Sequence, residues 1–215
     1  MIEALRNIFA PPGSLTAVRV WQEALNIVVL VLFALLAVSS YHYFATSRSF
    51  TSLGILAVNT LFLGLFLSRR TPKAETLSLP AWLLGVAGTV LPLLLRPSHG
   101  PGFIVLGTVL QIAGIALVAC GLLSLRRSFA VVPGNRGIRD GGLYRVVRHP
   151  IYVSELVALL GAVLVSPTLA NCVIWICECG LQFARARMEE EFLSSDPAYR
   201  AYRERVRFRL IPGMI

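Results

Sequence analysis

The chain has 215 residues, of which 56% are hydrophobic and only 14% are charged. Together with a mean hydropathy of +0.71, this composition excludes an ordinary soluble domain and indicates a polytopic membrane protein. The formal net charge of +9 would by itself also suit a nucleic-acid-binding protein.

Four apolar runs in the first 125 residues are long enough to cross a bilayer, because a spanning helix needs roughly 20 residues. They cover Trp21 to Tyr43, Phe50 to Ser68, Leu79 to Leu95 and Phe103 to Leu125. Apart from Glu23 they hold almost no ionisable residues, so we expect scaffold and lipid contact from them. The first run is not followed by a small-residue cleavage pattern, which predicts an anchor and not a cleaved signal peptide.

A fifth apolar region is divided by Pro167 into two arms, Ile151 to Ser166 and Thr168 to Ala184. Each arm is about 25 Å long at 1.5 Å per residue, which is short for crossing. They predict an antiparallel hairpin that either crosses a thin region or lies partly within a cytoplasmic cavity. We therefore predict one all-α domain, with four spanning helices in residues 1–125 and a cofactor-binding, catalytic half in residues 126–215.

The basic residues are divided unevenly between the two sides of this topology. If the N-terminus is cytoplasmic, eighteen of the twenty arginines and lysines are cytoplasmic, and only Arg48 and Arg96 lie outside. This asymmetry predicts that both termini lie in the cytoplasm. Topology and anionic lipid headgroups then account for the positive charge, so we expect membrane lipids and no nucleic acid as partners.

The segment before the hairpin is polar and rich in glycine, from Arg126 to His149. Such backbone cannot face lipid, so it must lie in the cytoplasm or line a cavity. Pro150 suits the first turn of the next helix, which places His149 at its start, beside Arg145 and Arg148. The cluster predicts a site for an anionic or nucleotide-like ligand.

The second arm of the hairpin carries a polar face. At 100° per residue, five polar side chains fall within about 60° of one another. They are Asn171, Glu178, Gln182, Arg185 and Glu189. An apolar helix does not place such residues toward lipid, so this face should point into the bundle, with Arg185 and Glu189 favoured over Arg187 and Glu190 as pocket residues.

Glu155 and Glu178 lie twelve and eleven residues from Pro167 on opposite arms. A symmetrical hairpin would place them at similar depth, where two carboxylates would share a proton or recruit an arginine. Their contact is a hypothesis. A metal site is not expected, because the three histidines are far apart in sequence and the four cysteines fall in predicted membrane helices.

The C-terminal half resembles the isoprenylcysteine carboxyl methyltransferase family and its relatives among membrane phospholipid methyltransferases. The segment from Pro133 to Tyr152 is similar to a G-x-Y-x-x-x-R-H-P-x-Y signature preceded by a glycine-rich loop. Arg185 to Leu193 is similar to an R-x-x-x-E-E-x-x-L element. Tyr199-x-x-Tyr202 and Arg209 to Pro212 follow at compatible distances.

The resemblance implies S-adenosylmethionine as cofactor, bound at the cytoplasmic end of the hairpin, and a lipophilic methyl acceptor that enters from the bilayer. Arg185 and Glu189 would be the catalytic residues, where cofactor and acceptor meet. The acceptor would contact Glu155 and Glu178. The implied cofactor-binding residues are Tyr144, Arg148, His149, Pro150, Tyr152, Gln182, Tyr199 and Tyr202.

Two other functions stay open at this point. Glu155 follows His149 by six residues, which resembles the R-H-P-N-Y-x-G-E element of membrane sterol and steroid reductases and would imply a nicotinamide cofactor. Ile151 stands where that element has asparagine, and the paired glutamates fit the methyltransferases better. A non-catalytic lipid-binding membrane protein is the third alternative. The sequence leaves the acceptor, whether carboxylate, amine or thiol, and the oligomeric state open.

Overall fold

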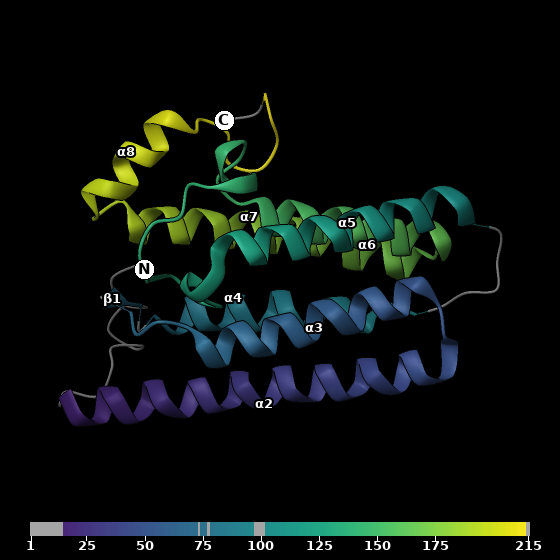
Figure 1. Cartoon of the computed structure of the whole chain (residues 1–215), viewed down its shortest axis with the longest axis horizontal. Helices are drawn as coiled ribbons and strands as arrows, with labels where there is room; N and C mark the ends of the chain where they lie inside the picture. The colour runs from purple at the N-terminus through teal and green to yellow at the C-terminus, as the bar shows by residue number, and fades with distance from the viewer. Residues whose placement is uncertain (1–14, 73, 77, 97–101, 214–215) are drawn as a thin grey trace.

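A computed structural model describes residues 15–72, 74–76, 78–96 and 102–213. The described chain is mainly α-helical, as predicted (Figure 1). The α-helices are α2 (Leu15–Ser47), α3 (Phe50–Ser68), α4 (Leu79–Val90), α5 (Ile104–Leu125), α6 (Pro150–Val165), α7 (Leu169–Leu193) and α8 (Pro197–Arg205). Short 3-10 helices are η1 (Leu91–Leu94), η2 (Arg126–Ser128) and η3 (Gly142–Arg145), and two-residue strands are β1 (Ala74–Glu75) and β2 (Gly134–Asn135). The first part of the predicted anchor, residues 1–14, lies outside the described residues.

Three helices in the described part of the chain are long and apolar enough to span a membrane, where the sequence predicted four. They fall within α2, α3 and α5, at Gln22–Ser47, Phe50–Ser68 and Ile104–Ser128. The expected span from Leu79 to Leu95 is not one helix. It divides into α4 and η1, because Pro92 lacks the amide proton that an α-helix needs and the chain tightens into a 3-10 turn there.

The predicted hairpin is present as α6 and α7, joined through Ser166, Pro167 and Thr168. Pro150 begins α6, where a missing amide proton costs nothing. The Thr168 hydroxyl accepts a hydrogen bond from the Asn171 amide and so caps α7. The second arm continues beyond the predicted Ala184 to Leu193, so Arg185 and Glu189 share one unbroken helix with Glu178.

Small residues let α5 and α6 approach each other closely. A Cβ atom at Gly114 would overlap the backbone of Ala158, and one at Gly107 would come within 2.6 Å of the Gly161 carbonyl oxygen. Packing of this kind lets helix backbones associate where apolar burial alone gives little preference over lipid. The pairing fixes where the start of α6, and with it His149, meets the rest of the bundle.

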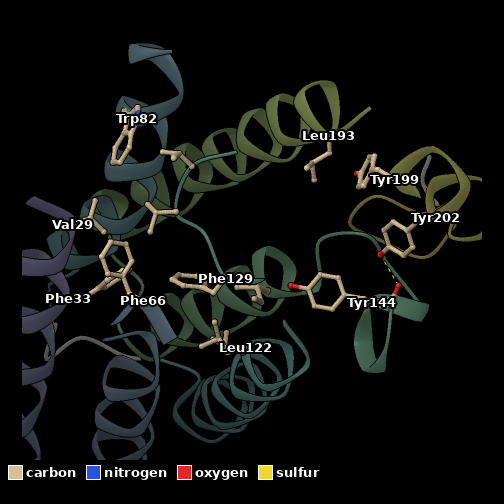
Figure 2. Packing of buried hydrophobic residues seen from close by; sticks show 14 of the residues in the cluster. Val29, Phe33, Phe66, Trp82, Leu122, Phe129, Tyr144, Leu193, Tyr199 and Tyr202 are labelled. Carbon is tan, nitrogen blue, oxygen red and sulfur yellow. Dashed lines mark hydrogen bonds between the residues drawn. The ribbon is translucent and has the colours of Figure 1, made fainter. Parts of the chain in front are cut away.

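The buried core is aromatic at both ends (Figure 2). At the α2–α3 end the Phe33 ring stacks on Phe62 at 5.6 Å and meets Phe129 at 6.1 Å. At the other end Tyr144 lies beside the Tyr199 and Tyr202 pair, and the Tyr202 hydroxyl donates to the Tyr144 carbonyl oxygen at 2.8 Å. The core therefore runs from the spanning helices to the loops that carry the predicted site.

The connecting segments of the C-terminal half meet at one end of the bundle, where Figure 1 places β1 and α8. Strand β1 pairs antiparallel with β2, so that Glu75 lies opposite Gly134. The Asn135 amide donates to Asp196 at the start of α8. These contacts tie the α3–α4 connection, the glycine-rich loop and the end of α7 into one layer.

Candidate active site

A cavity of about 360 Å³ opens between the helices below this layer. One part of its wall is polar and comes from residues 128–155 and from α7. The other part is apolar and comes from α2, α3, η1, α5 and α6. The predicted site residues on its wall are Tyr144, Arg148, His149, Tyr152, Glu155, Glu178, Arg185 and Glu189. Its size falls in the range of small-molecule sites, roughly 300–1,000 Å³.

The carboxylate of Glu190 forms a closed ion cluster beside the cavity. Its Oε1 accepts a hydrogen bond from Arg148 Nε at 2.6 Å and lies 3.2 Å from His149 Nε2. Its Oε2 accepts two hydrogen bonds from Arg209, at 2.9 and 3.1 Å. The side chains of Arg148 and Glu190 are each 3% exposed, so both charges are buried and compensated.

The chain after α8 completes this cluster. Arg148 Nη1 donates to the carbonyl oxygens of Val206 and Arg207, at 2.8 and 2.6 Å. The backbone amides of Arg148 and His149 donate to the carbonyl oxygens of Phe208 and Arg209. Residues 206–209 therefore hold the start of α6 in place. Arg148, predicted to contact the cofactor, reaches the cavity wall with its guanidinium already engaged by the protein.

His149, Tyr152 and Arg185 form a stack on the cavity wall. The His149 and Tyr152 rings are parallel, with centroids 5.3 Å apart. The Arg185 guanidinium lies over the Tyr152 ring at 4.7 Å. The Tyr152 hydroxyl donates to Glu189 Oε2 at 3.0 Å, and His149 Nδ1 lies 3.6 Å from the same oxygen. The two predicted catalytic residues thus sit at opposite sides of one aromatic ring.

A second buried polar group lies deeper in the hairpin, around Gln182. Its amide nitrogen donates to Glu155 Oε2 at 2.8 Å and to Glu178 Oε1 at 2.7 Å, so the two carboxylates are joined through Gln182. Its amide oxygen accepts from Arg185 Nη1 at 3.0 Å. Gln182 and Glu178 are fully buried. We refer to Glu155, Glu178, Gln182 and Arg185 as the hairpin quartet.

The hairpin quartet leaves hydrogen-bonding capacity unused. Glu178 Oε2 and Arg185 Nε are buried and have no partner among the described residues. Helix α4 covers the quartet at Gly88, where an added Cβ would lie 2.9 Å from Arg185 Nη1. Because buried polar groups are normally satisfied, these free positions indicate that a ligand or water completes the quartet.

A smaller compartment of about 60 Å³ adjoins the main cavity on the side of α8. Tyr144, Arg148, His149 and Glu189 line both spaces. Tyr199 and Tyr202, the remaining predicted tyrosines, line only the smaller one. Both are buried.

The electrostatics of the site follow from its contacts. Burial alone would lower the pKa of His149, but hydrogen bonds and charge from Glu189 and Glu190 raise it above its ordinary value. Burial alone would raise the pKa of both glutamates, but the hydrogen bond and charge of His149 lead the contacts that lower it. Burial also raises the pKa of Tyr144, Tyr199 and Tyr202. The tyrosines are therefore neutral donors and the glutamates anions at neutral pH.

The structure brings most of the predicted site residues together, and three differ from their expected place. Pro150 starts α6 without lining either space. Gln182 lies behind the wall and orients the carboxylates. Asn171, from the predicted polar face, instead bonds the Arg96 backbone at the far end of α7.

Sequence reasoning missed Glu75 and Arg136. Arg136 Nη2 donates to Glu75 Oε1 at 2.6 Å, and the two side chains are 1% and 5% exposed. They are 61 residues apart, and neither falls in the motifs quoted above. A signal was nevertheless present in the glycines at 134 and 137, which flank Arg136.

Comparison with known proteins gives one match. Residues 102–200 match the family model for phospholipid methyltransferases. No curated protein matches the chain significantly. The matched segment contains α5, the glycine-rich loop, the hairpin and Tyr199, which are the elements that build the cavity. It supports a membrane methyltransferase and leaves open which methyltransferase subfamily the chain represents.

Proposed function

We propose that the protein is an integral membrane methyltransferase that uses S-adenosylmethionine and acts on a lipophilic acceptor. The observation that carries this proposal is a single cavity with a polar end and an apolar end. A charged cofactor and a lipid-borne acceptor need such a pair of surfaces next to each other. The family match over residues 102–200 supports the same reaction class.

The polar end fits a sulfonium nucleotide. A cation is attracted to the faces of aromatic rings and to carboxylates, and Tyr144, Tyr152 and Glu189 supply both on one wall. The free carboxylate oxygen of Glu178 offers a further partner. When bound, the cofactor supplies the methyl group for an in-line displacement.

The apolar end fits the acceptor. It is lined by side chains from three different helices, including Phe33, Ile55, Val58 and Phe62. These rings and aliphatic groups lie on α2 and α3, which are candidate membrane spans. An acceptor with an acyl or isoprenoid chain would bury that chain here and present its reactive group to the hairpin quartet. A carboxylate, such as that of an isoprenylcysteine-like group, is the acceptor class we favour.

Arg185 and Glu189 have distinct tasks in this proposal. Arg185 projects into the cavity with its Nε free and would hold an acceptor carboxylate. Glu189 is fixed by the Tyr152 hydroxyl and is ionised, so it would stabilise positive charge and would take the proton from an amine acceptor. Alignment and exclusion of water would supply most of the rate enhancement.

The polar end would face the cytoplasm. The loops and helix termini near the two compartments carry nearly all basic residues, and Arg48 and Arg96 lie at the opposite ends of their helices. Positive charge gathers on the cytoplasmic side of membrane proteins. The cofactor would then reach its compartment from the aqueous side, and the acceptor from the bilayer.

The test is ligand binding followed by transfer. Protein purified in lipid nanodiscs is titrated with S-adenosylmethionine, and then incubated with isotopically labelled cofactor and a membrane lipid extract. We expect saturable binding and a labelled lipid. NADPH serves as the comparison ligand. Saturable NADPH binding without S-adenosylmethionine binding would favour the reductase, and binding of neither would refute an enzyme of either class.

A further inference from the structure

The smaller compartment contains two buried hydrogen-bond donors that lack a partner. They are the Tyr199 hydroxyl and Arg136 Nη1, in residues that are 3% and 4% exposed. Neither has a hydrogen-bond partner within the described ranges. The compartment measures about 60 Å³, whereas about 10–15 Å³ is enough for one water molecule. It has room for a group the size of a carboxylate.

Arg136 is held so that one nitrogen is left over. Its Nε donates to the Arg70 carbonyl oxygen at 3.0 Å, and its Nη2 donates to Glu75. The remaining Nη1 lies above Gly134, where a Cβ would come within 2.6 Å of it. The pairing of β1 with β2 keeps Glu75 opposite Gly134. The guanidinium is thus fixed at two of its nitrogens, and the third is available to a ligand.

The charge of this compartment favours an anion. Arg139 also lines it, and its Nε donates to the neutral Ser128 hydroxyl. Among the described residues, no carboxylate lies within ion-pair distance of Arg139. A buried donor without a partner costs free energy, and charge-assisted hydrogen bonds to an anion are the strong way to recover it.

We propose that this compartment is an anion subsite that binds the carboxylate of the cofactor's amino-acid end, with Tyr199 and Arg136 as donors. The inference rests on the proposed function and assigns one part of the ligand. A lipid phosphate has the same chemistry, but residues of α2, α3 and α4 do not line this compartment. The acceptor's chain would enter between those helices, so the cofactor is the better source of the anion.

The experiment compares S-adenosylmethionine with its decarboxylated analogue, which keeps the sulfonium and the amine. Wild-type protein should bind the analogue at least about tenfold more weakly, because a hydrogen bond between a neutral and a charged group is lost. Tyr199→Phe removes only a hydroxyl that has no partner. It should weaken binding of S-adenosylmethionine about tenfold, leave binding of the analogue unchanged, and leave thermal stability unchanged.

Tyr202→Phe is the matched control. Its hydroxyl is already committed to the Tyr144 carbonyl oxygen, so its loss should lower stability and leave the ratio between the two ligands as in wild type. Equal binding of both ligands by wild-type protein would overturn the subsite, as would competition of a short-chain phosphatidic acid with S-adenosylmethionine that Tyr199→Phe abolishes. If neither ligand binds, the proposed function itself fails.

Discussion

Two buried polar clusters on α7 differ in how completely the protein satisfies them. The Glu190 cluster has a partner for both carboxylate oxygens, from Arg148 and Arg209. The hairpin quartet, which lies farther along α7 and deeper in the bundle, leaves Glu178 Oε2 and Arg185 Nε free. The first cluster is closed and faces the C-terminal segment. The second is incomplete and lines the cavity, which indicates that the first holds the fold and the second awaits a ligand.

The comparison is tested most severely by Glu190→Gln. The substitution keeps the shape of the side chain and leaves Arg148 and Arg209 without their anion in a buried place. Removing one partner of a buried ion pair costs about 3–5 kcal/mol. We expect a correspondingly large drop in the midpoint of thermal unfolding in detergent.

Glu191→Gln is the control for that change. Glu191 pairs with Arg187 on the surface, where the side chains are 65% and 67% exposed, so its loss should cost less than about 1 kcal/mol. Equal stability losses in the two variants would show that the Glu190 cluster does not hold the fold.

Glu189→Gln should separate function from folding. The glutamine keeps a hydrogen-bond acceptor for the Tyr152 hydroxyl but loses the negative charge at the cavity wall. We expect methyl transfer to fall by about 100-fold or more, as for the loss of a positioned charged group in catalysis, with little change in the unfolding midpoint. The measurement is label transfer from the cofactor to lipid. Full activity in this variant would remove Glu189 from the mechanism.

Gly88→Ala tests whether the hairpin quartet must stay uncrowded. The added Cβ would lie 2.9 Å from Arg185 Nη1 and 3.5 Å from Glu178 Oε1. Overpacking of this kind costs about 1–3 kcal/mol, and it would displace Arg185. We expect reduced transfer activity and a lower unfolding midpoint.

Gly180→Ala is the matched control within α7, because nothing lies within 4 Å of the added Cβ. It should leave activity unchanged and stabilise the helix by up to about 1 kcal/mol. If both alanines affect activity alike, contact with Arg185 is not the cause.

The pH dependence of stability gives the smallest effect. The folded-state pKa of His149 is raised above the ordinary value of 6.5, so its contribution is fully present below that value and is lost as pH rises through the folded pKa. The unfolding midpoint should therefore fall as pH is raised from 6.5. In His149→Gln this slope should disappear. An unchanged slope in the variant would assign it to another group.

Glu190 acts at the other end of the pH scale. The pKa of its carboxyl is lowered, so its contribution is present above the ordinary value of 4.5 and is lost as pH falls through the folded pKa. The wild type should therefore be most stable between these two ranges.

The sequence predicted the helical class, the hairpin and the polar face of α7, because helical periodicity is a local property. It selected Glu189 over Glu190 as a cavity residue, and the cavity is lined by Glu189. It did not predict that Arg148 would be engaged by Glu190, because the two are 42 residues apart and their pairing depends on how α6 and α7 rotate against each other. The fourth span was wrong because hydropathy does not register the break that Pro92 makes in the helix.

The extended contacts of residues 206–209 have a consequence for biosynthesis. These residues supply four carbonyl acceptors and one arginine to the start of α6 and to Glu190. Until they have left the ribosome, a nascent chain with its hairpin already inserted lacks the groups that seat His149. Premature termination before residue 206 would leave an inserted but inactive protein, so a reporter fused downstream should join through a linker that spares this segment.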